Sequence, residues 1–272
     1  MTKLTVTVIT HNEAPHLGAA LESVSWADEI IVIDSHSTDD TVTTARRYTS
    51  NVEIRDWAGY GTQKNYAQHR ASHDWILSID ADERVTPELT REIQSLLREG
   101  PRAQGYRISR VSYYLGKWIR STDWYPDYHV RLYDRRTARW SEHRVHESIE
   151  CRGRVDTLRG ELLHYPYRDI SEHLTKIDRY TTLVAEQWAA EGRRTSALSA
   201  LVYPRLAFLR NFVLRRGFRD GHTGLLVSML NSYYVFLKYA KLYEMSRAGR
   251  AEPAGGQPDR LRAPDAAKTN RS

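Results

Sequence analysis

Cysteine is almost absent from this sequence. Among 272 residues only Cys151 is a cysteine, so the chain cannot contain an internal disulfide. Disulfide frameworks are typical of small secreted proteins, and a chain without one fits a reducing cytoplasm. The first ten residues contain no apolar run long enough for a signal peptide, so we expect the fold to begin there with a strand. With 27% charged and 40% hydrophobic residues, the composition excludes both a polytopic membrane protein and a wholly disordered chain.

Acidic residues are scarce in one part of the chain. Residues 193–250 contain eleven Lys and Arg but only two acids, Asp220 and Glu244, whereas the whole chain has a net charge of +6. The arginines alternate there with Leu, Phe, Tyr and Val, which favours an anionic membrane surface or a nucleic acid as partner. A packed helix pair with an exposed Arg face is the alternative. Residues 221–237 have no charged side chain, but their length favours a core or interfacial helix over a membrane span.

The first half of the chain alternates strand and helix patterns. Short runs rich in Val and Ile predict strands at residues 4–10, 29–34, 52–55 and 75–80. Helical patterns lie between them, at residues 15–24, 39–48 and 62–71. Thr86 and Pro87 predict the cap and first turn of another helix that runs to about Arg98. This alternation indicates an α/β protein with a mostly parallel sheet flanked by helices.

The second half has a different character. Aromatic residues and arginines alternate within residues 104–165, where we expect short strands and loops. Three helices are predicted after that, at residues 170–190, 197–215 and 222–244. The composition of the last residues, rich in Pro, Gly, Ala and charge, predicts a disordered tail. We therefore divide the chain into an α/β domain, a basic helical extension and a tail, at residues 1–165, 166–250 and 251–272.

Acidic side chains follow two of the predicted parallel strands. Asp34 ends the second strand, and Asp80 and Asp82 end the fourth. In open α/β sheets, ligands bind outside the carboxyl ends of the strands. Two carboxylates that flank one small residue can share a hard divalent cation with substrate phosphates. Turn or cap residues would also explain an isolated Asp-x-Asp, but its place after an apolar strand favours a metal site.

Several motifs in this order resemble the inverting family 2 glycosyltransferases, which have the Rossmann-like GT-A fold. The motifs are Thr-His-Asn-Glu, Asp-Ser-His-Ser-Thr-Asp-Asp and Asp-Ala-Asp, at residues 10–13, 34–40 and 80–82. More narrowly, the chain resembles the bacterial lipopolysaccharide-core β-glucosyltransferase type. The segments that carry this likeness are residues 26–30, 61–67, 124–132 and 145–147. The resemblance covers about residues 3–245.

The resemblance implies a role for individual residues. Relatives hold the base, ribose or uridine of the donor with residues that match Thr10, Asn12, Glu13, Asp34 and Asp39. Other donor-facing positions match Lys64, which would meet a phosphate, and Asn65. Asp80 and Asp82 match the motif that binds ribose and the metal, so Mg²⁺ or Mn²⁺ is the expected cofactor. Helix capping remains an alternative for Asp39, and an ordinary exposed charge remains one for Glu13 and Lys64.

Inversion at a sugar carbon also needs a base that takes the proton from the acceptor hydroxyl. Glu147 is the best match to the acid that relatives use, and His146 would orient it or contact the metal or a phosphate. Asp127 is the alternate base. Arg131 would bind the donor phosphates or an acidic acceptor. A packed loop histidine and a salt bridge to a nearby arginine are the structural alternatives for His146 and Glu147.

The chain lacks the Gln-x-x-Arg-Trp pattern of processive polysaccharide synthases, and it lacks a multi-span domain. This difference favours transfer of a single sugar over polymerisation. An aromatic cluster could stack on the acceptor sugar or form a small hydrophobic core; its members are Tyr113, Tyr114, Trp118, Trp124 and Tyr125.

We therefore predict an inverting glycosyltransferase that uses a UDP-sugar, with UDP-glucose as the expected donor. The expected acceptor is a lipid-linked glycan, such as a lipopolysaccharide inner-core sugar, at the cytoplasmic face of the inner membrane. Residues 197–245 would associate with the anionic membrane surface.

Three alternatives come from other classes of protein. A nucleotidyltransferase would need a Gly-rich phosphate loop after the first strand, and residues 10–17 contain none. A nucleic-acid-binding module would leave the acidic strand ends unexplained, and no zinc-finger or RNP-like motif supports one, so no nucleic-acid partner is expected. An inactive protein of the same fold is disfavoured because the expected acids are all present.

Overall fold

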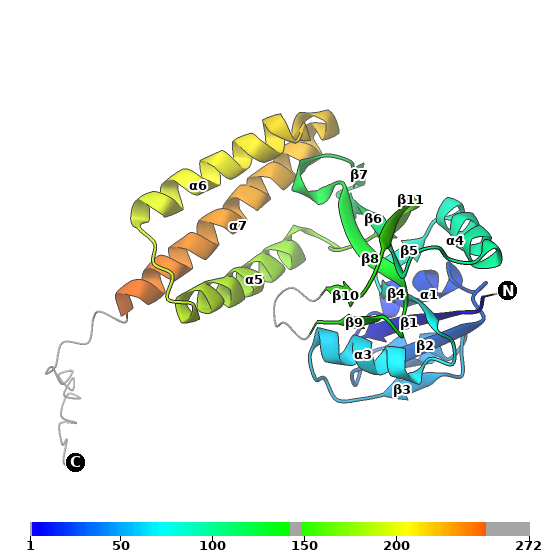
Figure 1. The fold of residues 1–272 in the computed structure, drawn as a ribbon. Helices are drawn as coiled ribbons and strands as arrows, with labels where there is room; N and C mark the ends of the chain where they lie inside the picture. Colours follow the sequence, from blue (N-terminus) through cyan, green and yellow to red (C-terminus); the bar gives the residue numbers. More distant parts are fainter. Residues whose placement is uncertain (1, 142–147, 249–272) are drawn as a thin grey trace, which may run out of the picture.

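The computed structural model describes residues 2–141 and 148–248 (Figure 1). The predicted tail, His146 and Glu147 lie outside these residues. The first half of the chain forms four parallel strands in the order β3-β2-β1-β4. They are β1 (Leu4–Thr10), β2 (Glu29–Asp34), β3 (Val52–Ile54) and β4 (Trp75–Asp80). All four predicted strands are thereby confirmed.

Helices cover both faces of these strands. Their bounds are α1 (Ala14–Glu22), α2 (Thr41–Ala45), α3 (Tyr60–Arg70) and α4 (Pro87–Glu99). Val6 and Val8 of β1 share one core cluster with Leu17 of α1 and Leu89 of α4, whereas Ile9 belongs to a second cluster with Ala67 of α3. The hydroxyl of Thr86 accepts a hydrogen bond from the backbone N–H of Leu89, which confirms the predicted cap of α4.

The second half extends the sheet in a mixed arrangement. The added strands are β5 (Glu83–Val85), β6 (Gly105–Tyr114), β7 (Lys117–Ile119), β8 (Asp127–Asp134) and β11 (Val155–His164). β8 joins β4 and β6 in antiparallel pairs, and β6 and β11 run parallel. A separate antiparallel pair is formed by β9 (Ala138–Trp140) and β10 (Ile149–Cys151). The sheet is thus parallel mainly in its first four strands.

Two of these strands are ten residues long, although the sequence predicted only short strands and loops in this region. The arginines obscured the strand pattern. Arg110, in β6, is only 18% exposed and lies against Glu83 and Asp127. Ion pairs with Glu83 and Asp127 thus allow an arginine to occupy a largely buried strand position, where a sequence pattern would predict an apolar residue.

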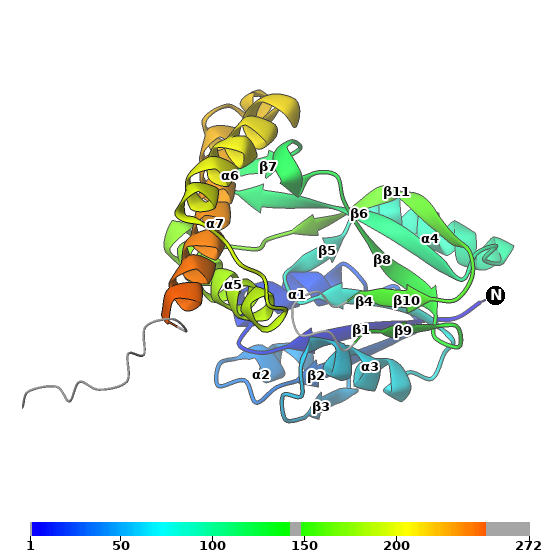
Figure 2. The same cartoon turned by 60° about the vertical axis from the view of Figure 1, so that its left-hand side comes forward.

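The C-terminal part is a layer of helices beside one end of the sheet (Figures 1 and 2). It contains α5 (Ile170–Ala190), α6 (Ala197–Leu209), which continues into a π-helical turn at Arg210–Leu214, and α7 (Gly221–Ala248). The three predicted helices are thus present. A small core joins this layer to the sheet through Tyr114, Ile119, Trp124, Tyr167 and Val227. Tyr114 and Trp124 are accordingly packing residues, not members of an open aromatic surface.

Candidate active site

Predicted site residues meet at the carboxyl edge of the parallel strands. Thr10 pairs in register with Asp34, and Ile9 with Asp80. Asp34 is fully buried, and its carboxylate accepts hydrogen bonds from the backbone N–H (2.8 Å) and the hydroxyl of Ser37. The hydroxyl of Thr10 is buried and has no hydrogen-bond partner among the described residues. Asp34 therefore fixes the loop after β2, and Thr10 keeps an unused polar atom at the strand end.

The loops after β1 and β2 are tied together by side chains that the sequence singled out. Asn12 has a left-handed backbone (φ 55°), donates its N–H to Ser37 Oγ at 2.8 Å and accepts from the N–H of Thr38 at 2.8 Å. The carboxylate of Asp39 accepts from the backbone N–H groups of Ala14 at 3.2 Å and Thr41 at 3.0 Å. Asn12 and Asp39 thus brace one rim of the site.

Asp80 is held by two cations. Its Oδ1 lies 2.8 Å from Nζ of Lys64, and its Oδ2 lies 2.6 Å from Nη2 of Arg131. Arg131 also contacts the fully buried Glu83 at 2.6 Å. Burial alone would raise the pKa of Asp80, but Arg131 and Lys64 outweigh burial and hold this pKa well below its usual range. Both oxygens of Asp80 are therefore already paired.

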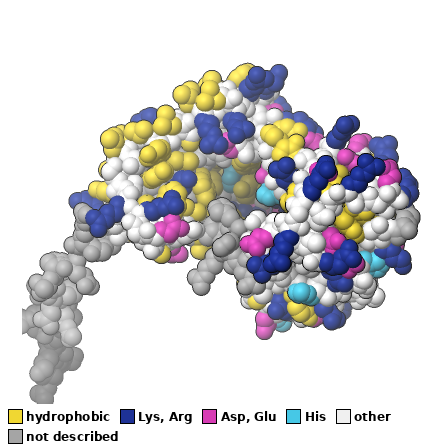
Figure 3. Space-filling model, in the orientation of Figure 1, with side chains coloured by type: hydrophobic (Ala, Val, Ile, Leu, Met, Phe, Trp, Pro, Cys, Tyr) yellow, Lys and Arg dark blue, Asp and Glu magenta, His cyan; other side chains and the backbone are white. Residues whose placement is uncertain are grey.

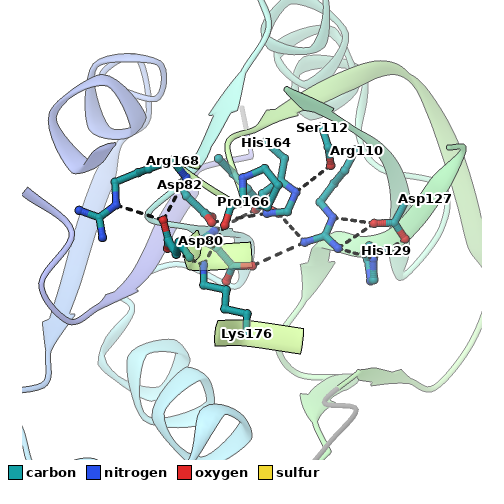
Figure 4. Close-up of polar contacts among 12 residues, drawn as sticks. Asp80, Asp82, Arg110, Ser112, Asp127, His129, His164, Pro166, Arg168 and Lys176 are labelled. Atoms are coloured by element: carbon teal, nitrogen blue, oxygen red, sulfur yellow. Dashed lines mark hydrogen bonds and ion pairs between the residues drawn. The ribbon is translucent and has the colours of Figure 1, made fainter. Parts of the chain in front are cut away.

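Asp82 lies next to a histidine that the sequence analysis did not select. Its Oδ2 is 3.5 Å from Nε2 of His164, at the end of β11. Nδ1 of the same ring lies 3.1 Å from the hydroxyl of Ser112 (Figure 4). Burial would raise the pKa of Asp82, but the neighbouring His164 lowers it below the usual value. Asp82 and His164 thus offer one carboxylate and one imidazole at the same point.

Asp82 also lines a small open cavity between the start of α1 and the start of α5. The lining residues are Asn12, Glu13, Pro15, His16, Asp82, Tyr165, Pro166, Arg168, Glu172 and Lys176. Burial, and next the charge of Asp82, raises the pKa of Glu13 to about 7. Opposite charges are present as well: Glu172 lies 3.0 Å from Arg168 and 3.1 Å from Lys176. The cavity therefore combines a candidate metal ligand with two cations that suit an anionic group.

Asp127, the alternate base, begins β8 beyond Arg110. Nη2 of Arg110 lies 2.7 Å from Asp127 Oδ2, and Nε2 of His129 lies 2.8 Å from Asp127 Oδ1. Figure 4 shows Arg110 between Asp80 and Asp127. Burial would raise the pKa of Asp127, but His129 and Arg110 lower it strongly. Asp127 is therefore ionised at neutral pH and is a weak base in this state.

Asn65 has a structural contact in place of the expected open position. Its side-chain amide donates to the backbone oxygen of Trp140 at 2.9 Å and accepts from the Trp140 N–H at 2.9 Å. Nζ of the neighbouring Lys64 lies 4.3 Å from the centre of the Trp140 ring while it pairs with Asp80. Asn65 thus anchors β9, and Lys64 faces the site.

Comparison with known proteins identifies the family. The model of "Glycosyl transferase family 2" matches residues 5–154. The chain belongs to glycosyl transferase family 2. The match runs from β1 into the loop before β11, so His164, Arg168 and Lys176 of this family 2 protein lie beyond it.

Individual relatives extend over nearly the whole chain. The lipopolysaccharide core biosynthesis glycosyltransferase LpsC of Rhizobium meliloti (strain 1021) is 31% identical over 248 residues, which are 89% of this chain and 92% of LpsC. The uncharacterized glycosyltransferase RT0209 of Rickettsia typhi is also 31% identical, over 92% of this chain and 90% of its own. A crystal structure of S. aureus TarS 1–349 with UDP-GlcNAc has a TM-score of 0.48 at 13% identity, covering 91% and 92% of the two chains.

This family 2 protein offers a divalent cation two protein ligands, Asp82 and His164. Within residues 2–141 and 148–248, no group of three or more His, Cys, Asp and Glu side chains could hold a metal. Asp82 and His164 form a pair, which is enough for an ion that takes its other ligands from water and phosphate. The sequence analysis missed His164 because it predicted only short strands and loops in this region, and so did not place the end of the ten-residue β11.

Proposed function

We propose that this family 2 protein is an inverting, metal-dependent glycosyltransferase that transfers a single sugar from a UDP-sugar, with UDP-glucose as the expected donor. The acceptor is a lipid-linked glycan, such as a lipopolysaccharide inner-core sugar. The observation that carries the proposal is Asp82, which pairs with His164 and lines a cavity together with Arg168 and Lys176. The name of the relative LpsC supports the class of acceptor.

Asp82 and His164 would hold the cation, and a bound cation would offset the charge that develops on the leaving diphosphate. Carboxylates suit Mg²⁺ and Mn²⁺, whereas an imidazole ligand is more typical of transition metals, so we favour Mn²⁺ of the two. Asp80 is a poorer ligand, because Lys64 and Arg131 occupy both of its oxygens. In this proposal Asp80 keeps these two cations in place toward the donor.

The remaining residues of the site hold the donor. The rim formed by Thr10, Asn12 and Asp39 would carry the nucleoside, since it lies at the carboxyl edge of the parallel strands. Arg168, which lies just before α5, and Lys176, on α5, would face the diphosphate from the same wall of the cavity. Positive charge fixed at the leaving group favours the transition state over the bound substrate.

A carboxylate must complete the reaction from the acceptor side. It takes the proton from the acceptor hydroxyl while the oxygen forms its bond to the anomeric carbon and the bond from that carbon to the diphosphate breaks. Attack opposite the leaving group inverts the configuration. We assign the base to Glu147, with His146 orienting it, and keep Asp127 as the alternate, because ion pairs with Arg110 and His129 lower the basicity of Asp127.

The test is calorimetric binding of UDP, with and without Mn²⁺, to the wild type and to Asp82→Ala. Metal-dependent binding by the wild type and its loss in Asp82→Ala are expected. Glu88→Ala, which removes an exposed carboxylate on α4, is the matched control and should bind normally. Failure of the wild type to bind UDP in either condition would overturn the proposal. A second assay of the wild type separates sugar transfer from nucleotidyl transfer. Sugar transfer releases UDP from UDP-glucose and does not release pyrophosphate.

On this proposal the protein works at the cytoplasmic face of the inner membrane, because a lipid-linked acceptor is confined to the membrane. Cell fractionation provides the measurement. Recovery of the protein with inner-membrane vesicles is expected, and its recovery only in the soluble fraction would contradict this location.

A further inference from the structure

The outer side of α6 is apolar and uncovered. Six large exposed side chains form it, five on α6 and Val213 in the π-helical turn that continues it; we call them the α6 face: Leu198, Leu201, Val202, Leu206, Leu209 and Val213. Leu198 is 65% exposed and Leu206 is 53% exposed. In Figure 3, hydrophobic side chains run along the outer edge of the molecule over α6. Exposed apolar surface of this extent on a helix marks a contact with a membrane or another protein.

The charge around the α6 face favours a membrane over another protein as the partner. Residues 197–214 contain no acidic side chain. Arginines lie before and after the helix and are exposed, at Arg193, Arg194, Arg215, Arg216 and Arg219. Arg215 lies 3.6 Å from Asp123, while Arg216 and Arg219 follow it along the same tip of the hairpin. An apolar strip between clusters of arginines complements an anionic lipid surface, where the strip enters the acyl region and guanidinium groups meet phosphates.

Length and composition alone would also allow α6 to cross a membrane. Among the described residues, one helical segment, Ala197–Leu214, is long and apolar enough to do so. α7, which contains the uncharged residues 221–237, does not satisfy this test of length and hydropathy. The orientation of α6 must therefore be decided from its contacts.

Buried polar contacts fix the end of α6 to the catalytic domain. Asn211 is 1% exposed; its Oδ1 accepts from the N–H of Asp123 at 2.8 Å, and its Nδ2 donates to the Asp123 carboxylate at 3.0 Å. Beyond the turn, the carboxylate of Asp220 accepts from the backbone N–H of Arg120 at 3.0 Å and from the hydroxyl of Ser121. A helix that spans the bilayer would have to break these contacts or draw the catalytic domain into the lipid.

Contacts along the helix lead to the same orientation. The hydroxyl of Ser232 on α7 donates to the backbone oxygen of Pro204 at 2.7 Å, and Asn231 donates to Asn211 at 2.9 Å. α6 is thus attached to α7 on its inner side and exposed on its outer side.

We propose that the α6 face is an in-plane membrane-binding surface for anionic phospholipid, with α6 parallel to the bilayer and its flanking arginines at the headgroups. The inference deepens the proposed function and rests on it for the lipid-linked acceptor. The loop held by Asn211 and Asp220 comprises residues 120–124 and directly precedes Asp127 on the acceptor side of the site. Docking of α6 would therefore set the height of the site above the membrane.

Vesicle flotation of the full chain tests the inference. We expect the wild type to float with vesicles of phosphatidylglycerol and phosphatidylcholine, and to float far less with phosphatidylcholine alone or at high salt. A triple variant, Leu201→Gln, Leu206→Gln and Leu209→Gln, should lower partitioning by about tenfold or more, because three exposed apolar side chains that would enter the lipid are lost. The matched control carries Ile54→Gln, Leu115→Gln and Leu174→Gln, which are exposed apolar residues elsewhere, and should float like the wild type.

Several results would overturn the inference. Equal flotation of the triple variant and the wild type would do so, as would a wild-type dimer that the triple variant converts to a monomer without any vesicle binding. Retention in the membrane after alkaline extraction would replace the in-plane orientation by a spanning one. Thermal unfolding of each variant is the control that checks whether the fold is retained. UDP binding in solution separates the two proposals: binding without flotation rejects only the membrane surface, and flotation without UDP binding rejects only the proposed function.

Discussion

Nε2 of His164 lies 3.5 Å from Oδ2 of Asp82, and the far side of the ring is held by Ser112 at 3.1 Å. A hydrogen bond at Nδ1 fixes which nitrogen faces a metal and how the ring is oriented. His164 ends β11 and Asp82 follows β4, so two strands that are far apart in the sequence bring the pair together. This relationship leads to the first prediction.

His164→Ala should lower the affinity for UDP in the presence of Mn²⁺ by about tenfold to a hundredfold, because one of two protein ligands is lost. UDP binding without metal should change little. Calorimetry in both conditions measures the difference. His69→Ala, which removes an exposed histidine at the end of α3, is the control. Wild-type affinity of His164→Ala in Mn²⁺ would exclude His164 as a ligand.

Arg131→Met should destabilise the fold by up to about 3–5 kcal/mol, because among the described residues Asp80 keeps only Lys64 as a close cation and the buried Glu83 keeps only Arg110. The folded-state pKa of Asp80 is depressed, so the stabilisation is present at neutral pH and is lost as the pH falls through the folded value. The difference from the wild type should accordingly shrink in acid. Urea unfolding at pH 7.5 and at about pH 2.5, below the ordinary pKa of an aspartate, measures it.

Arg136→Met is the control for Arg131→Met. Arg136 is 63% exposed and pairs with Asp134, so its loss should cost much less stability than the loss of Arg131. Equal destabilisation by the two variants would show that the ion pairs of Arg131 with Asp80 and Glu83 contribute no more to the free energy of unfolding than an exposed ion pair does.

The contrast between Asp80 and Arg131 shows what the sequence can predict. Asp80 was found because it follows a Val- and Ile-rich strand, and the period and composition of such a strand are local properties. Arg131 was assigned to substrate, yet its guanidinium also neutralises Asp80 and Glu83, which reach it from β4 and β5. An ion pair between distant strands leaves no local pattern. The same holds for Asn65, whose partner is the backbone of Trp140.

Lys176→Met should weaken UDP binding by about tenfold to a hundredfold and leave uridine binding unchanged, because the ammonium group would face the diphosphate. Lys176 comes from α5, in the helical part of the chain, and its Nζ lies 3.1 Å from Glu172 in the cavity. Calorimetry with the two ligands separates a phosphate contact from general damage to the site. Arg179→Met removes an exposed cation from the same helix and should bind both ligands normally. Equal loss for UDP and uridine would contradict the assignment.

Glu13→Gln should stabilise the protein at pH 8 and have little effect at pH 5. The folded-state pKa of Glu13 is raised to about 7, mainly by burial and then by Asp82. The folded state thus binds its proton more tightly than the unfolded state, and stability falls as the pH rises from about 4.5 to about 7. We expect a gain of about 1–3 kcal/mol at pH 8. Thermal unfolding at both pH values checks this, with Glu186→Gln as an exposed control on α5. An equal effect of Glu13→Gln at pH 5 and pH 8 would rule out titration as its cause.

Glu147→Gln should lower turnover by about 10²–10⁴-fold and leave metal-dependent UDP binding intact, as expected for loss of a general base. Glu150→Gln, which removes the exposed carboxylate paired with Arg139, is the control and should keep its rate. Single-turnover transfer from UDP-glucose and UDP calorimetry provide the two measurements.

Asp127→Asn decides between the two candidate bases. Asp127 has ion pairs with Arg110 and His129 that lower its pKa, so it accepts a proton less readily than an unpaired carboxylate. If Glu147 is the base, Asp127→Asn should lower stability, because Arg110 loses a partner, while transfer by the folded variant is reduced less than in Glu147→Gln. A near-normal rate for Glu147→Gln together with a collapse of the rate in folded Asp127→Asn would reverse the assignment, since the ion pairs would then have to open when the acceptor binds.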